Sequence, residues 1–193
     1  MRTRTVCVRV LTSDVSSTES ANMRIQTFKR VSLKALLMMP FLAFNLGQAS
    51  ETNFAPKAQL VIDKVYAIVG PLGQRSLANA GLNANYGFVV TEQGVILIDS
   101  GASAHSAAML EKVIAQVTPQ PVRWVLNTGS QDHRWLGNDY FARKGAQIHA
   151  LATTVQTQKT AAEQQVLGMA RFVGDQMKGT PSRIMPAMYS LAD

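Results

Sequence analysis

Apolar and polar positions follow two different periods along the chain from residue 60 onwards. Segments rich in β-branched and other apolar residues, bounded by polar or turn-forming residues, predict strands. The predicted strands are residues 60–69, 85–91, 94–99, 122–126 and 146–150. Segments with apolar residues three and four positions apart predict helices. The predicted helices are residues 102–117, with Ser103 as N-cap, 136–144 and 153–178. Strands that alternate with helices in this way predict an α/β fold.

The strand at 94–99 and the helix at 153–178 carry the most specific patterns. Val95-Ile96-Leu97-Ile98 is apolar without interruption, which predicts a strand with both faces buried. Glu92-Gln93 before this strand predicts a hairpin with residues 85–91. In the helix, Gly168 and Gly174 predict a break or a bend. Its predicted apolar stripe is Ala162, Val166, Met169, Val173 and Met177.

The net charge of +7 is concentrated at the N-terminus. Residues 1–50 contain seven basic and two acidic side chains, a charge of +5, which leaves +2 for residues 51–193. A nucleic-acid-binding domain would carry a basic patch with aromatic residues among the charges, and no such patch is present in residues 51–193. The composition therefore predicts no nucleic-acid partner.

Residues 23–50 have the layout of a secretory signal peptide. A basic stretch is followed by an apolar core at residues 35–46 and then by small residues at Ala49 and Ser50. The core of about 12 residues is shorter than the roughly 20 that a membrane-spanning helix needs. Residues 1–22 precede a natural start at Met23 and are interpreted as an over-called N-terminal extension. The pattern predicts a periplasmic or secreted protein that meets the membrane only during export.

The only cysteine, Cys7, lies before this predicted signal peptide. The exported domain, predicted at residues 58–193, therefore contains no cysteine and no disulfide framework. A lipoprotein anchor is not predicted either, because no cysteine follows the apolar core.

Three motifs occur in an order that points to a known family. They are NYGF at residues 85–88, GVILIDSG at 94–101 and NTGSQDHRWLGN at 127–138. Together they resemble the metallo-β-lactamase superfamily, and within it the exported hydrolases linked with quinoprotein or sulfur-oxidation systems. The family pattern His-x-His-x-Asp-His is incomplete here. The places of its first two histidines hold Gly129 and Gln131, or Thr128 and Ser130 in the other register.

The resemblance implies a fold and a chemistry. The implied fold is an αββα sandwich of two similar halves with zinc at one edge between them. Asp132 and His133 would be the remaining metal ligands, Asp132 would also orient or deprotonate a zinc-bound water, and Asp99 would organise the ligand turn without binding the metal. Zinc lowers the pKa of a bound water, which then attacks a carbonyl carbon. The implied substrate is a small ester, thioester or amide.

The chain departs from the family in its number of ligands and in its length. Catalytic zinc usually has three protein ligands, and this turn supplies two. The family's other histidines come from its second half, whereas no histidine or cysteine follows Leu151 here. We therefore interpret residues 58–193 as a truncated, N-terminal half of the sandwich. One apolar sheet face would then be exposed, which predicts aggregation or pairing with a partner or a second copy.

Other interpretations of the same residues remain open. Asp132 could cap a helix, with His133 hydrogen-bonded in the turn. Asp99 could serve only to bind backbone amides at the end of a strand. Trp135 is expected in the core or at its rim, His105 in solvent and His149 at least partly buried. At the level of function, the alternatives to a hydrolase are a non-catalytic periplasmic binding or accessory protein and a truncated, non-functional fragment.

Overall fold

The computed structural model describes residues 53–181 and 189–191, and the predicted extension and signal peptide lie outside them. The chain divides into two units, residues 1–47 and 48–193, and every described residue belongs to the second. No helix within the described residues is long and apolar enough to cross a membrane.

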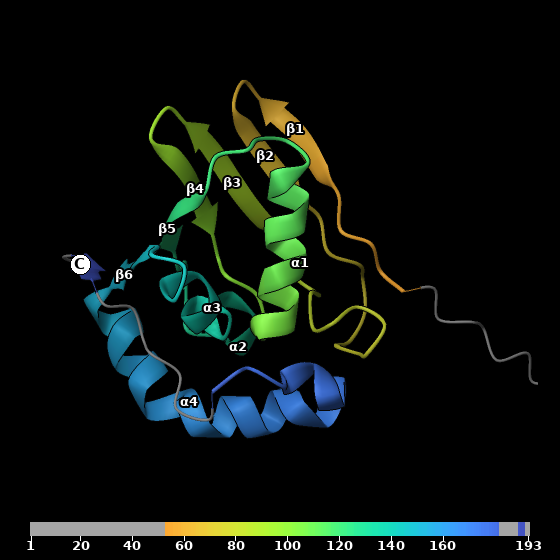
Figure 1. Cartoon of the computed structure of the whole chain (residues 1–193). Coiled ribbons are helices and arrows are strands. Elements are labelled where there is room, and N and C mark those ends of the chain that lie inside the picture. The colour runs from red at the N-terminus through yellow and green to blue at the C-terminus, as the bar shows by residue number, and fades with distance from the viewer. Residues whose placement is uncertain (1–52, 182–188, 192–193) are drawn as a thin grey trace, which may run out of the picture. The chain divides into compact units, whose positions relative to one another are not determined.

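The second unit is built around a mixed sheet of seven strands in the order β1 to β7 (Figure 1). The first four strands are antiparallel, and β4 to β7 are parallel to one another. The strands are β1 (Ala58–Ile62), β2 (Val65–Ile68), β3 (Tyr86–Thr91), β4 (Gly94–Ile98), β5 (Val122–Leu126), β6 (Gln147–Leu151) and β7 (Tyr189–Leu191). Helical segments connect the parallel strands, so the predicted α/β fold is confirmed.

In the described part of the chain, the connections between the parallel strands contain four α-helices and one 3-10 helix. These are α1 (Ala104–Ala115) between β4 and β5, α2 (Asp132–Trp135) and α3 (Asn138–Ala142) between β5 and β6, and α4 (Ala152–Val173) and η2 (Gly174–Met177) between β6 and β7. Ser103 is the N-cap of α1 as predicted, and with Ser106 it forms a capping box.

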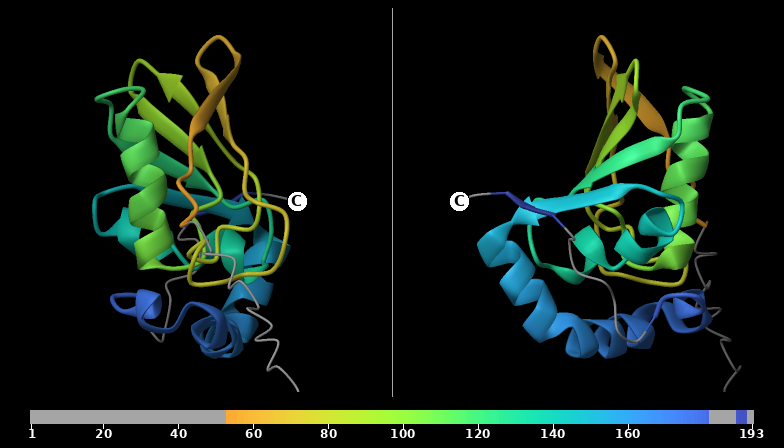
Figure 2. Two further views of the ribbon diagram at one scale, coloured as in Figure 1. Left: turned by 90° about the vertical axis from the view of Figure 1, so that its right-hand side faces the viewer. Right: turned by 60° about the vertical axis from the view of Figure 1, so that its left-hand side comes forward.

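One face of the sheet forms the main core. Phe88, Leu97, Val125 and Ile148 lie side by side on β3 to β6 and are almost completely buried. Apolar residues of α1 complete this cluster, and α1 lies against this side of the sheet in both views of Figure 2. Burial of such side chains is the main driving force for folding.

The opposite face of the sheet is only partly covered by described residues. Ile96 and Ile98 on β4 are half-buried, as are Trp124 and Leu126 beside them on β5. Complete burial of both faces of residues 95–98 was predicted, and it is found only for Val95 and Leu97. The described residues thus form one sheet with helices on one face, which corresponds to one half of the implied αββα sandwich.

Two predicted segments are each divided into two elements. Residues 60–69 form a hairpin of β1 and β2 rather than one strand, because the chain turns at Asp63 and at Lys64, whose φ is 62°. Residues 136–144 do not form one helix. A helical turn already begins at Asp132, and α3 follows Gly137. At Gly137 a Cβ atom would lie 2.1 Å from the Ser100 carbonyl oxygen, so the close approach of these two segments requires glycine.

The last helix follows its predicted stripe closely. Met169, Val173 and Met177 are buried, and they pack with Trp135 and Leu136 in a second apolar cluster. A break or a bend was predicted near Gly168 and Gly174: α4 is unbroken at Gly168 and ends before Gly174, whose φ is 48°. The short strand β7 was not predicted.

Candidate functional site at the Asp132–His133 turn

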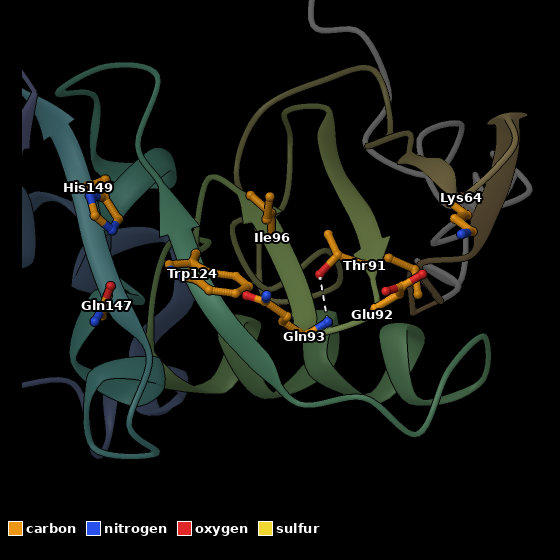
Figure 3. A pocket seen from close by; sticks show the side chains of 9 residues that line it. Lys64, Thr91, Glu92, Gln93, Ile96, Trp124, Gln147 and His149 are labelled. Atoms are coloured by element: carbon orange, nitrogen blue, oxygen red, sulfur yellow. Dashed lines mark hydrogen bonds between the residues drawn. The ribbon is translucent and has the colours of Figure 1, made fainter.

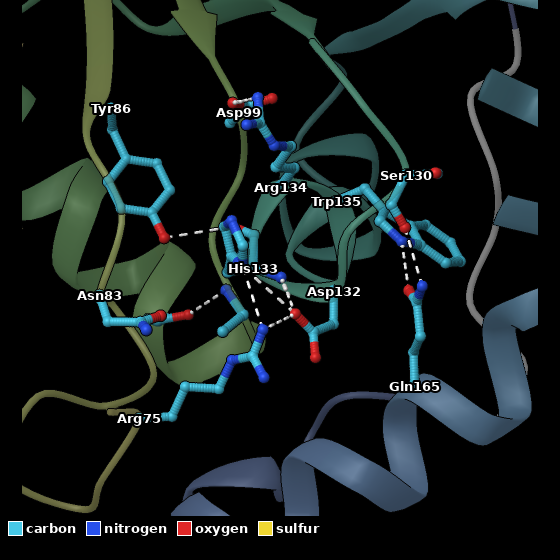
Figure 4. Close-up of polar contacts among 12 residues, drawn as sticks. Arg75, Asn83, Tyr86, Asp99, Ser130, Asp132, His133, Arg134, Trp135 and Gln165 are labelled. Atoms are coloured by element: carbon cyan, nitrogen blue, oxygen red, sulfur yellow. Dashed lines mark hydrogen bonds and ion pairs between the residues drawn. The ribbon is translucent and has the colours of Figure 1, made fainter. Parts of the chain in front are cut away.

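The residues that the sequence singles out meet at one edge of the sheet. Asp99 follows β4, Asn127 and Thr128 follow β5, and Asp132 and His133 begin α2. In a parallel pair of strands the carboxyl ends lie side by side, and ligand sites of α/β proteins commonly occur there. Figure 4 shows Asp99, Asp132 and His133 in this region, with Arg75 and Tyr86 approaching from the other side.

Asp99 fastens the turn that follows β5. Its Oδ1 atom accepts a hydrogen bond of 2.8 Å from the Thr128 amide, and Oδ2 accepts one of 2.8 Å from the Thr128 hydroxyl. Arg134 Nη1 lies 3.5 Å from Oδ2. Burial raises the pKa of Asp99, although the bonds from Thr128 and the charge of Arg134 act in the opposite direction. Asp99 itself has a φ of 63°, a conformation that costs a non-glycine residue energy and that these bonds hold in place.

Asp132 and His133 form a close pair. Asp132 Oδ1 accepts a 2.8 Å hydrogen bond from the His133 amide and lies 3.2 Å from His133 Nδ1. The two side chains are 14% and 16% exposed, so solvent reaches both. Burial raises the pKa of Asp132, but the hydrogen bonds from His133 and the charge of Arg75 outweigh it and leave the pKa below its usual value.

Arg75 joins this pair from a distant part of the chain. It lies in the loop between β2 and β3, and its Nη2 atom is 2.5 Å from Asp132 Oδ1 and 3.2 Å from His133 Nδ1. If Nδ1 carries a proton it donates to Asp132, and if it does not it accepts from Arg75. Arg75 belongs to none of the three motifs, and nothing in the local sequence pattern indicates a contact with a residue 57 positions away.

Tyr86 closes the site on the side of β3. Its hydroxyl donates a 3.2 Å hydrogen bond to the His133 carbonyl oxygen. Burial strongly raises the pKa of this hydroxyl, and the charges of Asp99 and Asp132 raise it further. Tyr86 is therefore a neutral hydrogen-bond donor near neutral pH.

A buried network of amides sets the position of the turn. Asn127 and Asn138 are the first and last residues of the NTGSQDHRWLGN motif, and each donates to the other at 3.1 Å and 2.8 Å. Asn138 also accepts from the Ser100 hydroxyl at 2.8 Å. Gln158 of α4 donates to Asn127 at 3.3 Å. The two ends of the motif are thus bound together, so the segment between them forms a compact loop.

A second anchor joins the turn to α4. The indole of Trp135 donates a 2.7 Å hydrogen bond to Gln165 Oε1, and Gln165 Nε2 donates a 2.8 Å bond to the Ser130 carbonyl (Figure 4). Trp135 was expected in the core or at its rim, and it is completely buried in the core.

The side chains of this site do not match a catalytic zinc centre. Catalytic zinc usually takes three protein ligands, and only Asp132 and His133 lie together here. Within residues 53–181 and 189–191, no group of three or more His, Cys, Asp and Glu side chains is arranged to hold a metal. At the places of the family's other histidines, the Thr128 side chain is bound to Asp99, and Gln131 is exposed.

A separate hollow of about 750 Å³ lies on the open face of the sheet. Ile96 and Trp124 form its apolar floor, and polar side chains that include Glu92, Gln147 and His149 surround them (Figure 3). His149 is half-buried, in agreement with the prediction. None of the residues that line this hollow belongs to the Asp132–His133 site, and His105 is exposed on α1 as predicted.

A comparison with protein-family models agrees with the motifs. Residues 80–149 match the family model of the metallo-beta-lactamase superfamily. A search of curated proteins found no significant match. Three similar solved structures are metallo-beta-lactamases, namely FIM-1 from Pseudomonas aeruginosa in a mono-zinc form (15% identity, TM-score 0.49), one from Hirschia baltica (15%, 0.49) and one from Pontibacter korlensis (18%, 0.48).

These similarities cover 72% of this chain and 52%, 52% and 53% of the three solved chains. The chain thus spans about half the length of the solved structures it matches. The family match contains Asp99, Asp132 and His133, together with the motifs at residues 85–88, 94–101 and 127–138. Over residues 80–149, the match to the family model supports the resemblance to the metallo-beta-lactamase superfamily.

Proposed function

We propose that this protein is an exported hydrolase of the metallo-β-lactamase superfamily that acts on a small ester, thioester or amide. The observation that carries the proposal is the pairing of Asp132 with His133 at the carboxyl edge of the sheet, within the matched segment. Both side chains are partly exposed, so a small substrate and a water molecule can reach them. The substrate class follows from the family resemblance.

In this proposal His133 is the general base and Asp132 orients it. A proton on Nδ1 would be held in a hydrogen bond to Asp132, so Nε2 is the atom that accepts a proton from the attacking water. Nε2 then returns this proton to the leaving group as its bond to the carbonyl carbon breaks. The lowered pKa of Asp132 keeps its carboxylate ionised near neutral pH, as this role requires. Positioned general bases contribute about 10² to 10⁴-fold to a rate.

Arg75 and Arg134 supply positive charge next to this pair. Attack on a carbonyl carbon places negative charge on the carbonyl oxygen, and nearby cationic donors stabilise that charge. Arg134 lies between Asp99 and Thr128, and Arg75 contacts Asp132. The residues present do not make a catalytic zinc site, so the proposed steps use these side chains alone.

Export through the predicted signal peptide at residues 23–50 places this activity in the periplasm or outside the cell. The proposed site suits that compartment, since residues 51–193 contain no cysteine that oxidation could modify.

A hydrolysis screen tests the proposal. The signal-processed protein is incubated with chromogenic esters, thioesters and lactams, alongside the variants His133→Ala and Asp132→Asn and the control His105→Ala at an exposed position. We expect hydrolysis of at least one class, a loss of about 10²-fold or more in the two site variants and no change in the control. No hydrolysis above the buffer rate, or equal rates in the wild type and His133→Ala, would overturn the proposal.

A further inference from the structure

We propose that the Arg75 guanidinium is the resident cation of the Asp132–His133 pair and excludes a metal ion from it. The resemblance implies zinc at this place, and the geometry disagrees with that implication. Arg75 Nη2 is within 3.2 Å of Asp132 Oδ1 and His133 Nδ1, the two atoms that face each other in the pair. A zinc ion held between these two atoms would lie about 2 Å from each, in the region that the guanidinium occupies.

The charges of the site are already balanced by protein groups. Two carboxylates, Asp99 and Asp132, face two guanidinium groups, Arg134 and Arg75. A divalent cation would therefore enter a region with no formal negative charge left to attract it, and the two guanidinium groups would repel it. An arginine remains charged at any ordinary pH, so a change of pH does not remove the repulsion between the guanidinium groups and a metal ion.

The loop that carries Arg75 is built to hold it there. Asn79 is 6% exposed, and its Oδ1 atom accepts from the amides of Ser76 at 2.9 Å and Gly81 at 3.0 Å, while its Nδ2 atom donates to the Gln74 carbonyl at 2.9 Å. These bonds fix the backbone on both sides of the arginine. The position of Arg75 therefore does not depend on its own side-chain contacts alone.

The end of α4 holds the same loop from the other side. Gln176 of η2 donates a 3.0 Å hydrogen bond to the Leu77 carbonyl, and the Arg75 guanidinium lies 6.0 Å from the centre of the Phe172 ring. A cation at this distance from an aromatic face is attracted to it. Withdrawal of Arg75 to admit a metal ion would break its contacts with both Asp132 and Phe172.

This inference concerns the site of the proposed function, but its test measures bound metal instead of hydrolysis. The protein is prepared after removal of the signal peptide, as wild type and as the variants Arg75→Met and Arg75→Lys. The control variant is Arg171→Met, which changes an exposed arginine of α4. Methionine keeps an unbranched, though shorter, side chain and removes the charge, whereas lysine keeps a charge. Zinc content is measured by elemental analysis, Co²⁺ binding by absorption titration, and folding by circular dichroism.

We expect no stoichiometric zinc and only weak Co²⁺ binding in the wild type, Arg75→Lys and Arg171→Met. Removal of the charge in Arg75→Met is expected to tighten Co²⁺ binding by about tenfold or more. A purely structural role for Arg75 would not produce this gain, nor its reversal by lysine.

Two results would overturn the inference. One is a wild-type protein that holds about one zinc per chain, together with a double variant, Asp132→Ala plus His133→Ala, that holds none. This result would overturn the inference even if Arg75→Met does not fold. The other is a folded Arg75→Met that binds Co²⁺ no better than the wild type. Zinc-free protein without hydrolysis would refute the proposed function alone, whereas zinc-loaded protein whose hydrolysis survives removal of the zinc would refute this inference alone.

Discussion

At the residue scale, some side chains of the site can be predicted from sequence motifs and others cannot. Asp99, Asp132 and His133 lie in recognisable motifs, and the structure brings them to one edge of the sheet as expected. Arg75 and Tyr86 belong to no polar motif, yet they bind Asp132 and the His133 backbone. A contact between a loop and a turn 57 residues later depends on the path of the chain, which local patterns do not contain.

Tyr86 gives a prediction at this scale. Replacement of Tyr86 by Phe removes the hydrogen bond to the His133 carbonyl and is expected to lower the free energy of unfolding by about 1 kcal/mol at neutral pH. The pKa of Tyr86 is raised in the folded protein, so the unfolded chain loses this proton first as the pH increases. Stability from this group is therefore present below pH 10, the ordinary tyrosine pKa, and is lost above it.

Urea unfolding of the wild type and Tyr86→Phe between neutral pH and pH 11 measures both effects. The wild type is expected to lose stability more steeply above pH 10 than the variant, so the difference between them shrinks. Two curves that stay parallel across the whole range would show that burial does not protect this hydroxyl.

At the element scale, the close approach of the turn after β4 to the start of α3 determines where the site forms. Gly137 lies against the Ser100 carbonyl, whereas Gly168 lies inside α4 with nothing within 4 Å of its added Cβ. Glycine is therefore required at position 137 but not at position 168. The sequence does not show this difference, since it places Gly137 in a motif and Gly168 in a helical pattern.

Alanine at these two glycines is expected to act in opposite directions. Gly137→Ala places a Cβ 2.1 Å from a backbone oxygen and is expected to destabilise the fold by about 1 to 3 kcal/mol. Gly168→Ala is expected to stabilise it by about 0.5 to 1 kcal/mol, because alanine has the higher helix propensity. Thermal unfolding of the two variants measures this contrast, and equal shifts in the same direction would contradict it.

The elements also show which patterns are reliable. The strand at 122–126 is found at its predicted bounds, since a short apolar run between prolines and a polar turn leaves little choice. The hairpin of β1 and β2 was not predicted. Only two polar residues, Asp63 and Lys64, lie between its two apolar strands, and so short an interruption does not distinguish a hairpin from one longer strand in the sequence. Strand β7 was not predicted because it has only three residues, too few for a sequence pattern. Its position in the sheet follows from its pairing with β6.

At the scale of the whole molecule, the sheet has one closed and one open face within the described residues. The uninterrupted apolar run at 95–98 predicted cover on two sides, but within the described residues α1 and its neighbours bury only the side of Val95 and Leu97. Ile96 and Trp124 are both half-buried, and they lie side by side on the floor of the hollow (Figure 3). Exposed apolar surface of this kind favours association.

Self-association therefore remains a prediction for the isolated protein. We expect sedimentation velocity to show species larger than the monomer that increase with concentration. A charge on the open face in Ile96→Lys is expected to reduce them, whereas Leu167→Lys, at an apolar position on α4 that is 60% exposed, is expected to have little effect. A wild-type protein that stays monomeric and resists proteolysis at high concentration would contradict this prediction.

The most direct test of the whole account is the rate of hydrolysis after metal removal. The processed protein is treated with EDTA, metal loss is verified by elemental analysis, and its rate on the best substrate of the screen is compared with that of His133→Ala. The account predicts that the rate survives chelation and falls by about 10²-fold or more in the variant. A rate that disappears with EDTA and returns with added zinc would contradict it.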